Sequence, residues 1–196
     1  MKTKPSAGRI ALISLGILLL LASLSAWAVP RIAGQKVSVN CAEAAAYLEE
    51  ILPARTTGIK EARANNDLPA VSFAGQDFTA LLTVPGFSVK LPVRSAWDKK
   101  AVKKVPCVYS GNPYEGTLII GGTDTDGQFD FVLRTDIGDP VTVTDMRGAE
   151  FHYTVLAVKH AQNVGTDNLK NEKCDLTLFT KDKQTGKWVL VRCGMK

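Results

Sequence analysis

The sequence predicts a mostly β domain of short strands and few helices, preceded by an N-terminal transmembrane helix. Three observations support this prediction: a long uncharged run near the N-terminus, one helical pattern after it, and a series of short β-type segments between turn residues. Many short strands with few helices are typical of an antiparallel barrel or a sandwich. We expect three parts, residues 1–30, 31–67 and 68–196.

The first part has the features of a membrane anchor. Ile10–Val29 is a run of twenty residues without a charge, which as a helix is roughly 30 Å long, the thickness of a bilayer's hydrocarbon core. Lys2, Lys4 and Arg9 precede it, so the positive-inside rule predicts a cytoplasmic N-terminus and an extracellular domain. A cleaved signal peptide is the alternative, because Ala26–Ala28 forms an A-x-A site. We favour the uncleaved anchor, which makes this a single-pass protein of the cell membrane.

The second part is expected to contain one helix and a linker. Asn40 can cap a helix over Ala42–Leu52, whose apolar residues recur on one face, and Pro53 ends the pattern. Residues 53–69 are polar and contain Gly, Asn and Pro, which is typical of a linker or of a segment wrapped on a surface.

The third part consists of β-type segments. Met146–Gly148 predicts a tight hairpin and Lys181–Gly186 a longer one, while Ala96–Val105 and Gln128–Leu133 are expected to be short helices. The expected strands, rich in Val, Ile, Leu, Thr and aromatic residues, are Phe78–Val84, Ser88–Val93, Thr117–Ile120, Val141–Asp145, Glu150–Val158, Asp175–Thr180 and Lys187–Cys193.

Composition narrows the classes of partner and cofactor. The formal net charge is +5, but three of the basic residues lie in the N-terminal part, and the small remainder gives no electrostatic footprint for nucleic acid. No nucleotide loop, haem motif or metal-ligand cluster is present, so we expect no cofactor and no metal. Asp124, Asp126 and Asp130 resemble part of a calcium loop, but its downstream acid is missing.

The sequence does not decide whether its four cysteines form disulfides or are free thiols. They are Cys41, Cys107, Cys174 and Cys193. In an exported domain they can form two disulfides, with three pairings that spacing does not separate, or they are buried thiols. No C-x-x-C pattern supports a zinc site.

A series of motifs resembles a known family. Ser88–Val93 (SVKLPV), Pro106–Gly111 (PCVYSG), Thr117–Gly122 (TLIIGG), Phe129–Leu133 with Gly138-Asp139, Asp175–Thr180 (DLTLFT) and Val189–Cys193 (VLVRC) occur in the order and approximate spacing of a sortase domain. They look most like the class B-like sortases of Gram-positive bacteria. The resemblance implies a sortase-type eight-stranded β-barrel. It also implies an ancestral transpeptidase that cleaved a surface protein's sorting signal with a Cys thiolate, aided by a His and an Arg.

This sequence departs from the family's pattern at each of the three catalytic positions. Thr123 stands where the resemblance places the His, Lys181 where it places the Cys, and Trp188 where it places the Arg. A shift of one residue would put Gly122 or Asp124 at the first position, and neither is a histidine. We therefore predict no intact catalytic residues, and Thr123, Asp124, Lys181 and Trp188 become candidates for a binding groove.

Three hypotheses about function follow. The first is a catalytically degenerate sortase, a pseudoenzyme, that binds a sorting-signal peptide, a wall component or an active sortase. The second is a structural accessory protein of the envelope or a pilus. The third is a cysteine-independent transpeptidase or peptidase in which Lys181 activates Thr123, although neighbouring aspartates should keep that lysine charged in an ion pair. Trp188 either packs on its strand or stacks on a bound peptide. The polar loop Lys159–Lys173 has few apolar residues with which to hold the usual sorting signal.

Overall fold

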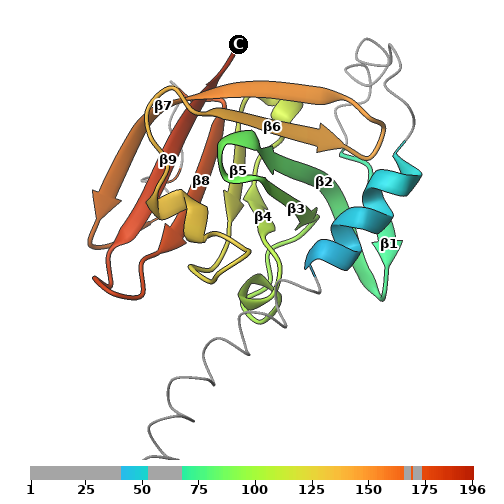
Figure 1. The fold of residues 1–196 in the computed structure, drawn as a ribbon, viewed down its shortest axis with the longest axis horizontal. Coiled ribbons are helices and arrows are strands. Elements are labelled where there is room, and N and C mark those ends of the chain that lie inside the picture. The colour runs from blue at the N-terminus through green and yellow to red at the C-terminus, as the bar shows by residue number, and fades with distance from the viewer. Residues whose placement is uncertain (1–40, 53–67, 166–168, 170–173) are drawn as a thin grey trace, which may run out of the picture. The chain divides into compact units, whose positions relative to one another are not determined.

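The computed structural model of this chain describes residues 41–52, 68–165, 169 and 174–196. Nine strands form one sheet in the order β1-β2-β3-β4-β5-β8-β9-β7-β6, and pairing of β2 with β6 closes strands β2 to β9 into an eight-stranded barrel (Figure 1). The strands are β1 (Val71–Phe73), β2 (Gln76–Val84), β3 (Val89–Arg94), β4 (Cys107–Ser110), β5 (Leu118–Gly121), β6 (Pro140–Asp145), β7 (Glu150–Ala161), β8 (Leu176–Lys181) and β9 (Trp188–Met195).

The predicted barrel is confirmed in outline, and most expected strands are present within a few residues of the expected bounds. Two strands were not predicted, β1 and β4. The expected helices at Ala96–Val105 and Gln128–Leu133 are wrong in extent, because only the 3-10 turns η2 (Ala101–Lys103) and η4 (Asp130–Leu133) form there. Two further 3-10 turns, η1 (Pro85–Phe87) and η3 (Pro113–Glu115), join strands.

The core fills the barrel interior with alternate side chains of the strands. On β8, Leu176 and Leu178 point inward and are completely buried, in agreement with the two-residue period of a strand. Thr177 and Phe179 of the same strand are also buried, at 3% exposure each, although they point outward. A second apolar layer therefore covers the outer face of this part of the barrel.

The predicted helix is confirmed over residues 41–51. Cys41, Ala44 and Leu48 are buried in the same apolar cluster as the barrel interior, and Tyr47 stacks on Phe73 of β1 with ring centroids 4.4 Å apart. The helix is thus part of the barrel's core. The boundary expected at residue 67 lies outside the described residues.

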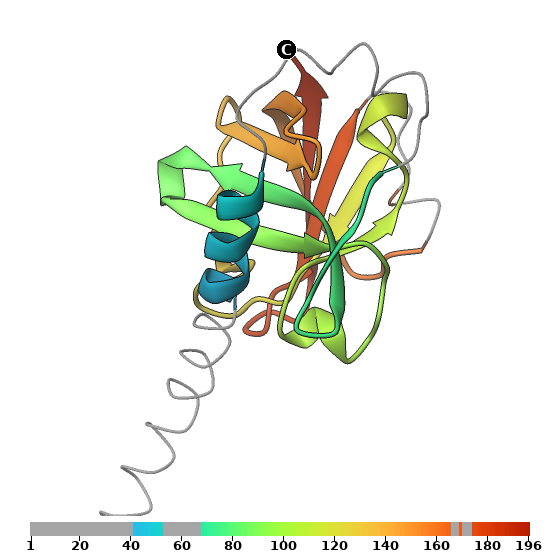
Figure 2. The same ribbon diagram turned by 90° about the vertical axis from the view of Figure 1, so that its right-hand side faces the viewer.

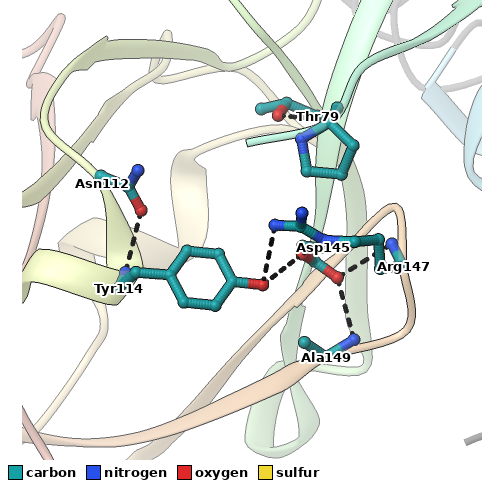
Figure 3. Close-up of polar contacts among 7 residues, drawn as sticks. Thr79, Asn112, Tyr114, Asp145, Arg147 and Ala149 are labelled. Carbon is teal, nitrogen blue, oxygen red and sulfur yellow. Dashed lines mark hydrogen bonds and ion pairs between the residues drawn. The ribbon is translucent and has the colours of Figure 1, made fainter. Parts of the chain in front are cut away.

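A buried polar network ties the start of β5 to the β6–β7 turn (Figure 3). The carboxylate of Asp145 has no exposed surface and accepts hydrogen bonds from the Tyr114 hydroxyl (2.6 Å), the Arg147 guanidinium Nε (3.2 Å) and the backbone N–H groups of Arg147 and Ala149 (2.9 Å each). Arg147 also donates to the Tyr114 hydroxyl, at 3.1 Å. The buried charge is therefore compensated from several sides, as a buried carboxylate requires.

The cysteines form no disulfide. Cys41, Cys107 and Cys193 are buried thiols and Cys174 is half-buried. The structure contains none of the disulfides considered above: Cys41 is on the N-terminal helix, Cys107 on β4, Cys174 just before β8 and Cys193 on the neighbouring strand β9. Burial raises the pKa of Cys41 to about 11 and that of Cys193 to about 12.

The predicted anchor, Ile10–Val29, lies outside the described residues. Within the part of the chain that the structure describes, no helix is both long and apolar enough to span a bilayer.

Candidate functional site

Three strands bring Thr123, Lys181 and Trp188 to one end of the barrel. β5 pairs with β8 in parallel, with Gly121 opposite Phe179, so the residues that follow both strands emerge together. β8 and β9 are antiparallel, with Lys181 directly opposite Trp188. Thr123, Lys181 and Trp188 thus gather at the same end, as the resemblance predicts for the family's catalytic positions.

Thr123 is held by hydrogen bonds of its own chain. Its backbone N–H donates to the Gln128 side chain at 2.6 Å, and its hydroxyl donates to the Val102 carbonyl at 2.9 Å. Gln128 is completely buried and donates to the same carbonyl at 3.1 Å. The hydroxyl proton of Thr123 is therefore used to fix the loop after β5 against the segment before β4.

Lys181 lies against an aromatic ring. Its ammonium nitrogen is 5.9 Å from the centroid of the Trp188 ring, within the range of a cation–π contact. Among the described residues it makes no ion pair with a carboxylate, so the expected salt bridge is wrong.

The neighbouring aspartates have other partners. Asp124 accepts from the Lys183 backbone N–H at 3.0 Å. Asp182 accepts from the hydroxyl of Thr185 and from the N–H groups of Gln184 and Thr185, and these bonds lower the pKa of Asp182, with a smaller contribution from the charge of His160. Both carboxylates thus stabilise the β8–β9 hairpin.

An aromatic cluster, made of Trp97, Tyr109, Phe179 and Trp188, covers the outer face beside these positions. Trp97 stacks on Phe179 at 5.6 Å, Tyr109 meets both rings edge-on at 5.2 and 5.6 Å, and Trp188 lies 6.0 Å from Phe179. A Cβ at Gly121 would lie 2.6 Å from Trp97 and 2.5 Å from Phe179, so glycine permits this close approach of the rings to β5.

Trp188 therefore packs against Phe179, the first of its two interpretations, while part of its surface stays exposed. Sequence reasoning missed the cluster as a unit, because Trp97 and Tyr109 are far from Phe179 and Trp188 along the chain. Tyr109 lies within the motif PCVYSG, which contributed only to the family resemblance.

None of the four cysteines is an exposed thiol beside Thr123 and Lys181. Cys107 lies opposite Gly121 at this end, but it is completely buried and its thiol donates to the Val105 carbonyl at 3.4 Å. Cys174 lies before β8, at the end of that strand opposite to Lys181, and lines a pocket of about 590 Å³ with Asp175.

In the described part of the chain, neither histidine makes a hydrogen bond with Thr123 or Lys181. His152 contacts Thr142 and Glu150 on the outer face of β6 and β7, and His160 is exposed on β7 opposite Val189. Among the described residues no group of acidic, His and Cys side chains is arranged to hold a metal ion. Asp124 faces the hairpin and Asp130 pairs with Arg134, so these two acids do not converge.

Comparison with known proteins gives a consistent result. The sequence profile of the sortase domain matches residues 82–193. No curated protein matches the chain. Among solved structures, the chain is similar to a sortase D5 transpeptidase of Clostridium perfringens, with 15% identity, TM-score 0.59 and coverage of 84% of this chain and 98% of that one.

Two further structures support the same fold. Sortase C-1 of Actinomyces oris is 18% identical, with TM-score 0.53 and coverage of 79% and 96%. Sortase A of Corynebacterium diphtheriae is 16% identical, with TM-score 0.52 and coverage of 83% and 84%.

Proposed function

The chain belongs to the sortase family, and we propose that it is a membrane-anchored, extracellular member that has lost transpeptidase activity and acts by binding. A sortase reaction needs a thiolate nucleophile, a proton carrier and a donor aimed at the substrate's developing oxyanion. Here Thr123, Lys181 and Trp188 occupy the place where the resemblance puts those three groups.

The contacts of Thr123 and Lys181 carry this proposal. The Thr123 hydroxyl donates to a backbone carbonyl, so it is not aimed at Lys181 as a nucleophile would be. The Lys181 ammonium is exposed and lies over an aromatic ring, whereas a lysine that acts as a base needs a dry pocket to lower its pKa. The hypothesis of Thr-Lys catalysis therefore has no support in the geometry.

The remaining parts of the proposal rest on the sequence. The uncharged run Ile10–Val29 would anchor the chain with its domain outside the cell. The assignment to the class B-like sortases of Gram-positive bacteria rests on the sequence motifs alone, since the three solved structures above are of classes A, C and D.

A purely structural role in the envelope is the second candidate. The aromatic cluster supports it, because Trp97 and Phe179 fill the outer face at Gly121. A peptide that lay on β5 at Gly121 would have to displace Trp97.

The test is turnover by the full-length chain in non-ionic detergent. Fluorogenic sorting-signal peptides are offered with and without an amine acceptor, and cleavage is followed by fluorescence and mass spectrometry. We expect none from the native chain. Cleavage that Lys181→Ala abolishes would overturn the proposal.

A revertant sharpens this test. It combines Lys181→Cys, Thr123→His and Trp188→Arg, and cleavage by it would indicate that the fold still accommodates a sorting signal. Residue 123 is the suitable place for the histidine, because a Cβ at Gly122 would lie 2.3 Å from the Phe129 ring. An inactive revertant, with the native chain also inactive, favours the structural role.

A further inference from the structure

One edge of β3 is left open in the barrel. β3 pairs with β2 along its whole length, but it pairs with β4 only at its last residue, where Arg94 lies opposite Cys107. Every other pair of neighbouring barrel strands is joined at three or more residues. Within the described part of the chain, residues 89–93 therefore have no strand beside them on the side of β4.

The direction of the backbone identifies the groups on this open edge. The Arg94 N–H donates to the Pro106 carbonyl at 2.9 Å, toward β4. Backbone groups alternate between the two edges of a strand, so those of Lys90 and Pro92 point the same way. The proline agrees with this direction, because its missing N–H then costs no bond to β2. The open edge thus offers the N–H of Lys90 and the carbonyls of Lys90 and Pro92.

A groove of about 310 Å³ runs along this edge. Residues 87–91 line it without a gap in the sequence. Successive residues of a strand point to alternate faces, so a groove that contacts all of them follows the strand edge and not one face. Phe87 and Val89 are half-buried there and Leu91 is buried. The groove can therefore cover apolar side chains as well as backbone hydrogen-bonding groups.

The start of the N-terminal helix and the loop after β5 complete the groove. Cys41 and Ala42, the first two residues of the helix, line it, and so do Asp126 and Asp130 of the loop. Figure 2 shows the blue helix in front of the green hairpin of β2 and β3. The chain thus enters the described domain at the groove itself, because residue 40 is bonded to a residue that lines it.

The three residues before Asn40 have the pattern of a short strand. Residues 37–39 are Val-Ser-Val, two β-branched apolar residues on either side of a polar one. Asn40 is expected to cap the helix, and a capping residue has an extended backbone, so an extended segment can lead directly into it. Three extended residues span roughly 10 Å, enough to follow β3 from Leu91 to Val89.

We propose that residues 37–39 dock in this groove as a short strand added to the open edge of β3. Their backbone bonds the N–H and the carbonyl of Lys90, Val37 and Val39 cover the apolar groove, and Ser38 faces outward beside the Lys90 side chain. Chain connectivity selects this occupant, because a segment already bonded to the helix loses far less freedom on docking than a separate molecule does.

The docked segment also contacts the loop after β5, which carries Thr123 and Asp124 of the candidate site. It therefore stabilises one wall of that site. This inference goes beyond the proposed function and is independent of whether transpeptidase activity has been lost.

Cross-linking tests the docking without relying on stability. In the full-length chain in non-ionic detergent, Ser38→Cys is combined with Lys90→Cys and with Cys174→Ser, which removes the half-buried native thiol; the other three native thiols are buried. Residues directly opposite on neighbouring strands have Cβ atoms about 4.5–5.5 Å apart, close to the reach of a disulfide. Oxidised glutathione should therefore link positions 38 and 90 within one chain, as detected by mass spectrometry of tryptic peptides.

A matched control replaces the second cysteine position. Ser38→Cys with Lys159→Cys and Cys174→Ser moves the partner thiol to an exposed lysine position on β7. Its cross-link should form at least roughly tenfold more slowly, because the two thiols then meet only through random motion of the tether.

Hydrogen exchange measures the same docking with no cysteine added. The Lys90 amide should exchange at least roughly tenfold more slowly in the native chain than in Val37→Asp, Val39→Asp, because carboxylates are not tolerated against an apolar groove. The control Ile32→Asp, Gly34→Asp adds the same charge outside the segment and should leave this exchange unchanged. Exchange of the core amide of Leu178 should be the same in all three chains, which shows that each variant is folded.

Three outcomes would overturn the proposal: no link between positions 38 and 90, an equally fast link to position 159, or Lys90 exchange that is the same in the native chain and in Val37→Asp, Val39→Asp. Links between chains that increase with protein concentration would also overturn it and would assign the groove to a second copy. None of these measurements involves peptide turnover, so failure of this proposal is distinguishable from failure of the proposed function.

Discussion

Two charged groups lie near opposite ends of β5 in very different surroundings. The carboxylate of Asp145, near the start of the strand, is completely buried and accepts several hydrogen bonds. The ammonium of Lys181, beyond the end of the strand, is exposed and lies over the Trp188 ring. The hydrogen bonds around Asp145 connect η3 to the β6–β7 turn, and removal of this carboxylate leaves buried polar groups without partners. Lys181 is held by few bonds and keeps its charge in water. The charge of Asp145, which stabilises the fold, and the charge of Lys181, which is exposed to a partner, thus lie near opposite ends of β5.

The largest expected effect comes from the buried cluster. Asp145→Ala should lower the free energy of unfolding by about 3 to 5 kcal/mol, because the Tyr114 hydroxyl, the Arg147 guanidinium and two backbone N–H groups lose their acceptor. Urea unfolding followed by tryptophan fluorescence measures it. The matched control, Asp182→Ala in the exposed hairpin, should have a much smaller effect. Similar losses from both would contradict the distinction between the two ends.

A smaller effect is expected from Tyr114. Tyr114→Phe should cost about 1 to 2 kcal/mol by removing its bond to Asp145.

The same residue gives the fold a pH dependence. Burial and the bond to Asp145 raise the pKa of Tyr114 to about 12, above the value of about 10 in an unfolded chain. The neutral phenol is thus favoured in the fold: its contribution is complete below about pH 10 and is lost as the pH rises through 12. Burial also raises the pKa of Tyr153, so the Tyr114→Phe variant is still expected to lose some stability at high pH through that phenol. The native chain should lose more stability than Tyr114→Phe between about pH 9 and 11.5 in the same urea measurement; equal losses would show that Tyr114 does not titrate as expected.

The smallest effect is expected at the exposed end. Lys181→Ala should change the free energy of unfolding by no more than about 1 kcal/mol, since an exposed cation–π contact contributes little. Thermal unfolding monitored by circular dichroism checks this. A loss above about 2 kcal/mol would mean that Lys181 belongs to the scaffold and not to a binding surface.

The sequence was most informative where a local pattern decides the structure. The helix over residues 41–51 and strands such as β2 and β8 carry their periodicity in the chain itself. β1 is three residues long and β4 four, too short for alternation to identify them. The sequence of residues 96–105 predicts a short helix, but the chain turns at Asp98, whose side chain accepts hydrogen bonds from the N–H groups of Lys100 and Ala101.

The candidate site was predicted only in part. The family motifs located Thr123, Lys181 and Trp188, and the strand pairing brings these positions together. The bond from Thr123 to Val102 could not be predicted, because it joins residues 21 positions apart through a loop with no regular period. The same holds for Tyr114 and Asp145, which lie 31 positions apart.

The parallel pairing of β5 with β8 also has a consequence for folding kinetics. Thr180 donates to the Gly122 carbonyl across 58 positions of sequence, so this end of the barrel forms only after a long loop has closed, and closure costs entropy that local hairpins do not lose. The β6–β7 and β8–β9 hairpins can form early, but the strands that unite Thr123 with Lys181 must wait for the C-terminal part of the chain. During synthesis, the end of the barrel that carries Thr123 and Lys181 is therefore among the last features of the domain to assemble.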